Sequence, residues 1–276
     1  MSTTTKPWAL ALIYALLIAG SILMLLPFLW MISTSLKHSS EVIVLPPKWI
    51  PSRLQWQNYV TAWQAAPFGR YMINSVVVTF LCTVGELVTT ILASFAFAKL
   101  RFYGRDALFA ILLATMMVPQ EMLLIPNYIT LTELGWLDRY EALIIPWIAS
   151  VFAIFLLRQY FLGIPQQLYY ACRIDGCRDW GFLWRIMVPL SKPALVTIAL
   201  LKAIGSWNAF LWPLIMTNSE EMRTMPVGLT AFFSETDLNY ELLMAASMMI
   251  VAPMLLLYAA LQRSIVEGIS RGGLKG

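Results

Sequence analysis

Very few residues of this chain could act as catalytic groups or as metal ligands. Its 276 residues include one His and three Cys, which are His38, Cys82, Cys172 and Cys177. Cys172 and Cys177 lack the two further ligands that a tetrahedral zinc site needs. The chain has no G-x-x-x-x-G-K-[ST] loop that could bind nucleotide phosphates, and no Ser–His, Asp–Asp or metal constellation suited to a membrane enzyme. We therefore expect a protein that is not an enzyme, with no catalytic residue, no metal and no cofactor bound by this chain.

The composition indicates a membrane protein. Hydrophobic residues make up 59% of the chain and charged residues 12%, whereas soluble domains carry roughly 45–50% and about 25%. The mean hydropathy is +0.71. These values exclude a soluble enzyme, a disordered chain and a nucleic-acid-binding protein.

Six stretches between charged residues are long enough to cross a bilayer, which takes about 20 apolar residues. They are Pro7–Leu36, Tyr71–Ala98, Ala107–Thr132, a stretch from Ala142 to about Arg158, a stretch from near Pro193 that contains Lys202, and Leu242–Gln262. The first is too long for the apolar part of a secretory signal, so we expect an uncleaved anchor. The sequence thus predicts an all-α membrane protein with six transmembrane helices.

The distribution of Lys and Arg predicts the orientation of these helices. With the N-terminus in the cytoplasm, twelve of the 19 Lys and Arg residues fall in inner segments and six in outer loops. Short cytoplasmic loops carry an excess of Lys and Arg in membrane proteins. Both termini are therefore predicted to be cytoplasmic. Because no Cys is then predicted outside, we expect no disulfide, with Cys82 buried in the second span.

The inner loop between the fourth and fifth spans is the most informative segment. Pro165 can begin a helix, because its missing N–H would be unpaired there, and Asp175-Gly176 favours a turn. A second helix, Trp180–Met187, is predicted to stop before Pro189. One face of the first helix would combine small and apolar side chains at helical spacing: Leu168, Ala171, Cys172 and possibly Tyr169. Such a hairpin could fit a groove on a soluble protein, or it could lie on lipid, which its five basic residues would favour.

This loop resembles the signature of permease subunits of ATP-driven (ABC) importers. The signature reads Tyr170-Ala171-Cys172-Arg173-Ile174-Asp175-Gly176, followed by Val188-Pro189. The chain is most similar to the carbohydrate and glycerol-phosphate uptake permeases, and the likeness continues in Asn74-Ser75, in Ser206–Leu214 and in the C-terminal end. It departs from the family where Tyr170 replaces a Glu, Cys172 an Ala and Cys177 another Ala.

The resemblance implies a single type-I permease domain over residues 1–276. Its parts would be a first span (1–36), an outer loop (37–70), core spans 2–6 (71–262) and a cytoplasmic tail (263–276). The loop after the fourth span would be the coupling helix, which docks on a cytoplasmic ATPase through Tyr170, Ala171, Cys172, Asp175 and Gly176. The tail would contact the ATPase through Gly272, Gly273, Leu274 and Lys275.

The resemblance also implies the partners and the location. A second homologous permease would complete a path for a sugar or related polyol. A dimeric cytoplasmic ATPase would hold ATP and Mg, and an external solute-binding protein would deliver the solute. The chain would be a multi-pass protein of a bacterial or archaeal inner membrane, in contact with lipid and with no nucleic acid.

Four residues are candidates for the translocation path: Trp207, Asn208, Glu86 and Glu121. Ionisable side chains inside spans are costly and are functional candidates by default. Glu86, Glu121 and Lys202 could relay ions in a secondary transporter, could line a solute path, or could pair with one another. Trp207-Asn208 offers a stacking face and an amide for a sugar ring, although helix packing is the alternative.

Overall fold

A computed structural model describes residues 7–233 and 239–272 of the chain. Throughout these ranges the regular structure is helical. Within the described residues, three helices are long and apolar enough to cross a membrane, or up to six if each of three bent pairs forms one span. The chain divides into two compact units, Met1–Ala66 with Leu229–Ala252, and Pro67–Gly228 with Pro253–Gly276.

Three long helices confirm the first, second and sixth predicted segments as helical. They are α1 (Pro7–Ser35), α3 (Phe68–Lys99) and α14 (Tyr240–Gly272). Their apolar windows lie in Trp8–Ser35, Phe68–Lys99 and Tyr240–Ala260. The α14 helix continues ten residues beyond the predicted end at Gln262.

The other three predicted segments lie in bent helix pairs, and the fifth falls wholly within the second helix of its pair. The first joins α4 (Arg105–Thr115) to η2 (Gln120–Leu123) and α5 (Leu124–Glu133), with a bend of 88°. The second joins α6 (Tyr140–Ile144) and η3 (Ile145–Trp147) to α7 (Val151–Leu162), with a bend of 40°. The third joins Asp179–Leu190 to α11 (Lys192–Trp207), with a bend of 77°.

The predicted span Ala107–Thr132 is broken in the structure. The backbone N–H groups of Met116, Met117 and Val118 each bond to the carbonyl three residues back, so the helix tightens before it ends. Pro119 then follows, and it can neither donate a helical hydrogen bond nor leave Val118 free to stay helical. The chain therefore turns sharply at this proline.

In the first unit, residues 37–56 fold back onto the end of α1. Asn58 of α2 (Gln57–Gln64) donates from its side-chain nitrogen to the carbonyls of Ser35 and Lys37, at 2.9 and 2.8 Å.

The Lys37 ammonium is buried and lies 3.9 Å from the centre of the Trp30 ring. This packing against an aromatic face stabilises a cation near the C-terminal end of a helix. Burial lowers the pKa of Lys37. This unit also contains η1 (Ser39–Glu41) and η6 (Leu229–Phe232).

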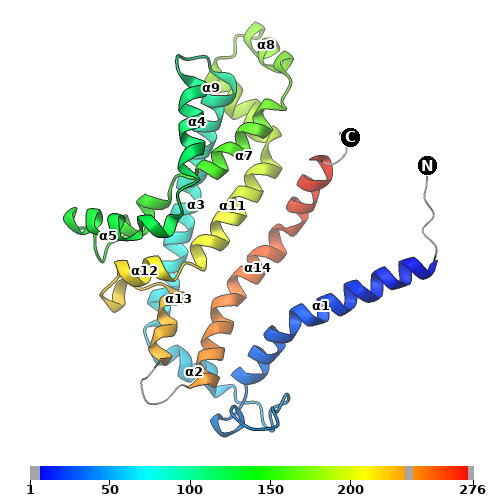
Figure 1. Cartoon of the computed structure of the whole chain (residues 1–276), viewed down its shortest axis with the longest axis vertical. Helices are drawn as coiled ribbons and strands as arrows, with labels where there is room; N and C mark the ends of the chain where they lie inside the picture. Colours follow the sequence, from blue (N-terminus) through cyan, green and yellow to red (C-terminus); the bar gives the residue numbers. More distant parts are fainter. Residues whose placement is uncertain (1–6, 234–238, 273–276) are drawn as a thin grey trace. The chain divides into compact units, whose positions relative to one another are not determined.

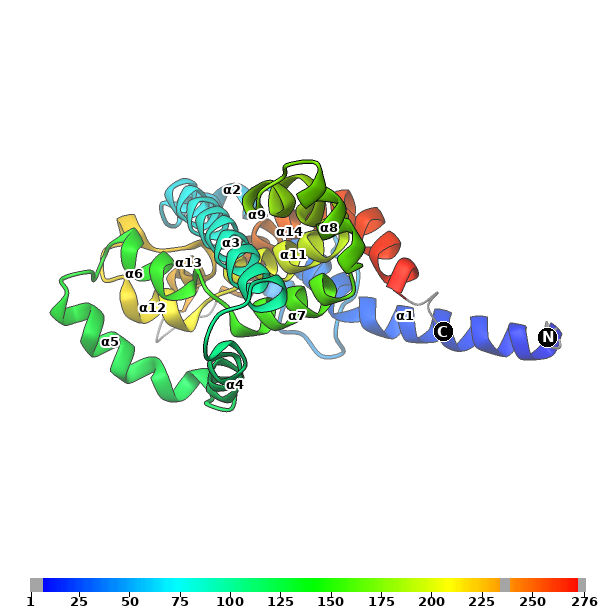
Figure 2. The same cartoon turned by 90° about the horizontal axis from the view of Figure 1, so that it is seen from above.

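In the second unit, α3 packs against both α7 and α11. Figures 1 and 2 show these three helices running alongside one another. Hydroxyl groups of α3 bond to the chain around α7, from Ser94 Oγ to the Ile154 carbonyl (2.9 Å) and from Thr89 Oγ1 to the Ile148 carbonyl (2.6 Å). Small polar residues of this kind join helices inside membranes.

Two buried clusters fill the two ends of this second unit. One lies between α3, α7 and α11 at the end that carries α8 (Gln166–Ile174) and α9 (Asp179–Phe182), and includes Phe95, Leu157, Phe161, Phe182 and Met187. The other lies near α12 (Leu211–Met216), and includes Val78, Cys82, Leu143, Trp212 and Met216. Beyond α12 the chain continues through η5 (Glu220–Met222) and α13 (Met225–Gly228).

Candidate functional site

The predicted helix–turn–helix is present, and Pro165 begins it as expected. Its first helix is α8 (Gln166–Ile174), and its second begins with α9 (Asp179–Phe182). At the turn, Gly176 has a φ of +78°, which is the left-handed region that favours glycine. The Cys177 N–H donates to the Cys172 carbonyl (2.8 Å), and the Gly176 N–H donates to the Arg173 carbonyl (3.2 Å). This pair of bonds is the Schellman ending of a helix.

Side-chain contacts hold the two helices together across this turn. The Tyr169 hydroxyl donates to Asp179 Oδ1 at 2.8 Å, and Arg173 Nη1 lies 3.7 Å from the same oxygen. The hydrogen bond to the Asp179 carboxylate raises the pKa of Tyr169. The Tyr169 ring also meets the Phe182 ring edge-on, with centroids 5.1 Å apart. The hairpin is therefore a defined body and not a loose loop.

The predicted common face of α8 is divided by the structure. Cys172 is buried and Tyr169 is partly buried, and both pack against the cluster that contains Phe182. By contrast, the other two members of that predicted face, Leu168 and Ala171, are exposed. Tyr170 and Ile174, which lie outside the predicted face, are 56% and 86% exposed. Of the five predicted coupling residues, Tyr170, Ala171, Asp175 and Gly176 are exposed, and Cys172 is buried. Cys172 thus anchors the hairpin, a role that helical spacing alone did not predict.

The second helix of the hairpin does not stop before Pro189, which corrects that prediction. The chain continues from α9 through a π-helical segment, Leu183–Met187, into α10 (Val188–Leu190). The N–H of Val188 bonds to the Leu183 carbonyl, five residues back. A wider π turn makes room for the ring of a following proline, which would clash with a carbonyl in a regular helix.

Cys172 and Cys177 form a disulfide, so the expectation of no disulfide is wrong for this structure. Their Cα atoms lie 5.1 Å apart, within the usual range for a disulfide. The turn explains this proximity, because the bond from the Cys177 N–H to the Cys172 carbonyl joins the same two residues. Cys82 is free and buried, as expected.

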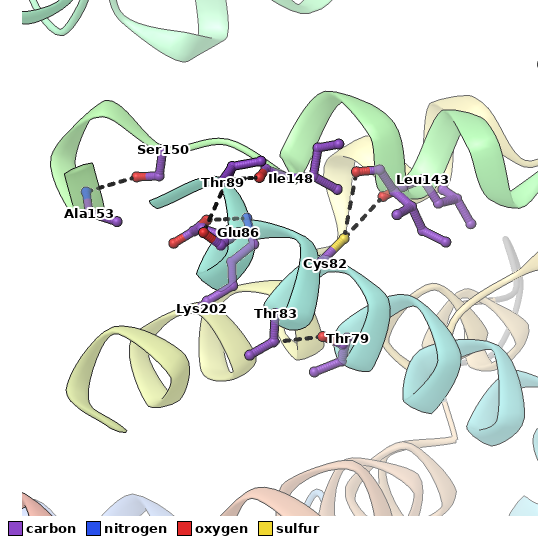
Figure 3. Close-up of polar contacts among 11 residues, drawn as sticks. Thr79, Cys82, Thr83, Glu86, Thr89, Leu143, Ile148, Ser150, Ala153 and Lys202 are labelled. Atoms are coloured by element: carbon purple, nitrogen blue, oxygen red, sulfur yellow. Dashed lines mark hydrogen bonds and ion pairs between the residues drawn. The ribbon is translucent and has the colours of Figure 1, made fainter. Parts of the chain in front are cut away.

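A cavity of about 830 Å³ lies within the second unit. Its lining comes from α3, the α4–α5 break, the α6–α7 break, α11 and α12, and includes Glu86, Trp147, Ser150, Lys202 and Trp212. Lys202 Nζ of α11 lies 2.9 Å from Glu86 Oε2 of α3, and the two side chains are 15% and 8% exposed. Figure 3 shows them reaching toward each other. The two charges therefore neutralise each other at the cavity wall.

The structure brings only one of the four predicted path residues to this cavity, and that residue is Glu86. Trp207 is buried and does not line the cavity, while Asn208 is exposed at the end of α11. Glu121 is exposed in η2, just beyond the Pro119 break. Glu121 therefore joins neither the ion pair nor the cavity lining.

Sequence reasoning missed the aromatic residues of the cavity wall. Trp147 and Trp212 meet edge-on with ring centroids 5.5 Å apart, and Trp212 Nε1 donates to the Ala142 carbonyl at 3.0 Å. Each Trp adjoins a proline in the sequence, at Pro146 and Pro213. These prolines mark the breaks that place the rings inside the unit, but span-end tryptophans fit interfacial belts equally well.

The predicted tail contacts lie almost entirely outside the described residues. Gly272 ends α14, whereas Gly273, Leu274 and Lys275 fall beyond the part of the chain that the structure describes.

Comparison with known proteins identifies the family of this chain. Residues 88–271 match the family described as "Binding-protein-dependent transport system inner membrane component". The chain is 35% identical over 271 residues to the arabinooligosaccharides transport system permease protein AraQ of Bacillus subtilis, covering 97% of this chain and 95% of that protein. It is 33% identical over 264 residues to the sn-glycerol-3-phosphate transport system permease protein UgpE of Yersinia pestis, covering 93% and 94%.

Solved structures show the same fold. A chain of a bacterial ABC transporter involved in the import of the acidic polysaccharide alginate matches with a TM-score of 0.83 and 25% identity, covering 95% of this chain and 99% of that one. A chain of the alginate transporter in complex with an alginate pentasaccharide-bound periplasmic protein matches with a TM-score of 0.64 and 16% identity, covering 92% and 95%. Nothing in these matches supports the ion-coupled secondary transporter. The chain is a non-catalytic permease subunit, and it belongs to the family of binding-protein-dependent transport system inner membrane components.

Proposed function

We propose that this chain is the permease subunit of an ATP-driven importer for a carbohydrate or related polyol. A second homologous permease would complete the path. The named solutes of similar proteins include arabinooligosaccharides and alginate, which supports a saccharide. The cavity supports the same class, because aromatic rings beside hydroxyl and amide groups suit the C–H faces and hydroxyls of a sugar.

The proposed topology has six spans and two cytoplasmic termini within one permease domain of residues 1–276, in a bacterial or archaeal inner membrane. α11 alone would form the fifth span, because the other half of its bent pair, Asp179–Leu190, contains the hairpin helix α9. Each of the other two bent pairs would count as one span. The excess of Lys and Arg in the predicted inner segments supports this orientation. The Lys37–Arg70 loop would then face outward, toward an external solute-binding protein, as would the segment around Glu220.

The hairpin of α8 and α9 would be the coupling helix that docks on the ATPase. Its exposed apolar side chains, Tyr170 and Ile174, could enter a groove of a soluble partner. Its buried side chains, Cys172 and Phe182, pack against the cluster shared with α3, α7 and α11. A movement of the docked ATPase would therefore be passed to the spans as a rigid displacement.

The ATPase would be a dimeric cytoplasmic protein that holds ATP and Mg, because this chain has no phosphate-binding loop. The tail residues Gly272, Gly273, Leu274 and Lys275 would make a second contact with it. Because Tyr170 occupies the position of the family's Glu, this interface would use aromatic packing where the family has a carboxylate.

The single observation that carries this proposal is the hairpin itself, anchored by buried residues and exposed at Tyr170 and Ile174. Its test is reconstitution of the chain with its second permease, ATPase and binding protein in lipid vesicles. We expect ATP hydrolysis to rise when the loaded binding protein is added, and this chain alone to hydrolyse no ATP. Uptake that proceeds without any ATPase, driven by an ion gradient, would contradict the proposal.

A further inference from the structure

The charge of the cavity bears on which solutes the path accepts. Among the described residues that line it, Glu86 and Lys202 carry charge, and the rest are apolar, aromatic or neutral polar. The similar proteins do not decide the matter, because the solutes in their names include a neutral oligosaccharide and two anions, glycerol phosphate and the acidic polysaccharide alginate. The side chains of this chain must therefore supply the argument.

The only lining cation within the described residues is already paired. Lys202 Nζ lies 2.9 Å from Glu86 Oε2, and both side chains are largely buried. Lys202 Nζ also lies 5.9 Å from the centre of the Trp147 ring. An anionic solute would have to compete with Glu86 for the Lys202 ammonium. If the solute bound the ammonium, the buried Glu86 carboxylate would be left without a partner. Burying an unpaired charge is strongly unfavourable.

The remaining lining groups suit an uncharged solute. Trp147, Trp212 and Phe210 offer ring faces and edges, whereas Gln120, Ser150 and Ser206 offer an amide and hydroxyls. The Ser150 oxygen accepts from the Ala153 N–H at 3.3 Å, which leaves its hydroxyl proton able to donate. Saccharide rings and polyols present apolar C–H faces and hydroxyl groups, so such a wall can satisfy them without any net charge.

We infer that the path selects an uncharged saccharide or polyol against uronates and phosphates, and that Glu86 sets this preference by neutralising Lys202. The inference rests on the proposed function and narrows its solute class. Glu86 is here a specificity-determining residue, because it neutralises Lys202, the one cation among the described lining residues that could attract an anion.

The first test measures solute binding to the purified complex of this chain with its second permease and ATPase in nanodiscs, without the binding protein. The neutral probes are di- and trisaccharides, glycerol and sorbitol, and the anionic counterparts are the matching uronic-acid saccharides and glycerol 3-phosphate. We expect the best neutral probe to bind at least about tenfold tighter than its counterpart, or about 1.4 kcal/mol. Equal or tighter binding of the anion would overturn the inference and leave the carbohydrate importer standing. If no probe of either charge binds, the inference of a charge-selective path fails, whereas the importer itself is judged separately by the stimulation of ATP hydrolysis on addition of the loaded binding protein.

The second test compares Glu86→Gln with the double variant Glu86→Gln/Lys202→Met in the same assay. Glu86→Gln frees the ammonium and should shift the ratio of neutral to anionic affinity by at least about tenfold toward the anion. The double variant carries neither charge and should keep the wild-type preference within about twofold. Identical ratios in the two variants would overturn the role of Glu86. Should Glu86→Gln fail to fold, the exchanged pair Glu86→Lys/Lys202→Glu must retain the neutral preference.

Discussion

At the scale of single residues, the backbone at Gly176 decides whether the α8–α9 hairpin can form its turn. Its φ of +78° closes the Schellman ending of α8, yet an added Cβ would meet no heavy atom within 4 Å. Space is therefore available at this position, and the restriction is conformational. A left-handed backbone costs an L-residue about 1–2 kcal/mol, and asparagine tolerates it best.

Gly176→Val should therefore weaken coupling, whereas Gly176→Asn should be nearly neutral. We expect the valine variant to lose most of the binding-protein stimulation of ATP hydrolysis and the asparagine variant to stay within about twofold of wild type. The assay is ATP hydrolysis by the reconstituted complex, with membrane insertion checked by yield. Equal activity in the two variants would show that the left-handed turn is not needed for coupling.

A second prediction at this scale concerns the contribution of the Glu86–Lys202 ion pair to the stability of the protein. Lys202→Met leaves a buried carboxylate unpaired, which costs about 3–5 kcal/mol. We expect a clearly lower melting temperature for the single variant in detergent micelles, and recovery of most of the loss in Glu86→Gln/Lys202→Met. A double variant no more stable than Lys202→Met would show that the two groups do not depend on each other.

Residue-level patterns predicted local features well and packing poorly. The helix start at Pro165 and the turn at Asp175-Gly176 could be predicted, because both features depend on residues that are neighbours in the sequence. The burial of Cys172 could not be predicted, because Phe182 and other residues distant in the sequence determine which side of α8 packs against the rest of the protein. Trp147 and Trp212 were missed as a cavity wall for the same reason.

At the scale of elements, α3 depends on close contact with the α6–α7 break. A Cβ at Gly85 would lie 2.7 Å from Ile148 Cγ2 and 3.7 Å from the Ile148 Cα. Thr89, one turn further on, bonds to the Ile148 carbonyl. The absence of a side chain at Gly85 therefore lets the α6–α7 break approach α3.

Gly85→Ala should consequently destabilise the protein by about 1–3 kcal/mol, the usual cost of overpacking. Gly205→Ala is the matched control, because nothing lies within 4 Å of an added Cβ there and alanine favours a helix. We expect thermal unfolding to give a lower melting temperature for the first variant and an unchanged or higher one for the second. The reverse order would contradict the close packing of α3.

The loop after α1 makes a prediction about pH. Hydrogen bonds from the Lys48 ammonium and from Ser52 lower the pKa of Glu41 to about 2. Because this pKa is below the ordinary value of 4.5, the stabilisation from Glu41 is present above pH 4.5 and is lost as the pH falls toward 2. The difference in melting temperature between wild type and Glu41→Gln should therefore be constant above about pH 5.5 and shrink in acid. In a Lys48→Met background this pH dependence should largely disappear, and its persistence there would rule out the Lys48 contact as its source.

Prolines show how far element boundaries can be predicted. Pro119 ends a helix and turns the chain by 88°, whereas Pro189 lies inside a continuous helical run. The difference is the π-helical segment before Pro189, which accommodates the ring. That segment depends on packing of Leu183 and Met187 in the buried cluster, so the sequence around each proline could not distinguish the two outcomes.

At the scale of the whole molecule, composition and charge were sufficient to predict an all-helical membrane protein. Runs of apolar residues identified at least part of every candidate span, because hydrocarbon thickness sets a minimum length. The three bends were not predicted, since whether a proline such as Pro119 or Pro189 bends the chain depends on the packing around it. The proposed task of the molecule, which is to pass the motion of an ATPase to a solute path, depends on the hairpin being the contact point.

Site-specific photo-crosslinking in the assembled transporter tests this central claim most directly. A photoreactive residue at Ile174, which is 86% exposed on α8, would be compared with one at Met122, which is 70% exposed in η2. We predict a crosslink between position 174 and the ATPase, and none between position 122 and the ATPase. Crosslinks from position 174 to lipid alone, in an assembly that still hydrolyses ATP on addition of the loaded binding protein, would contradict the account.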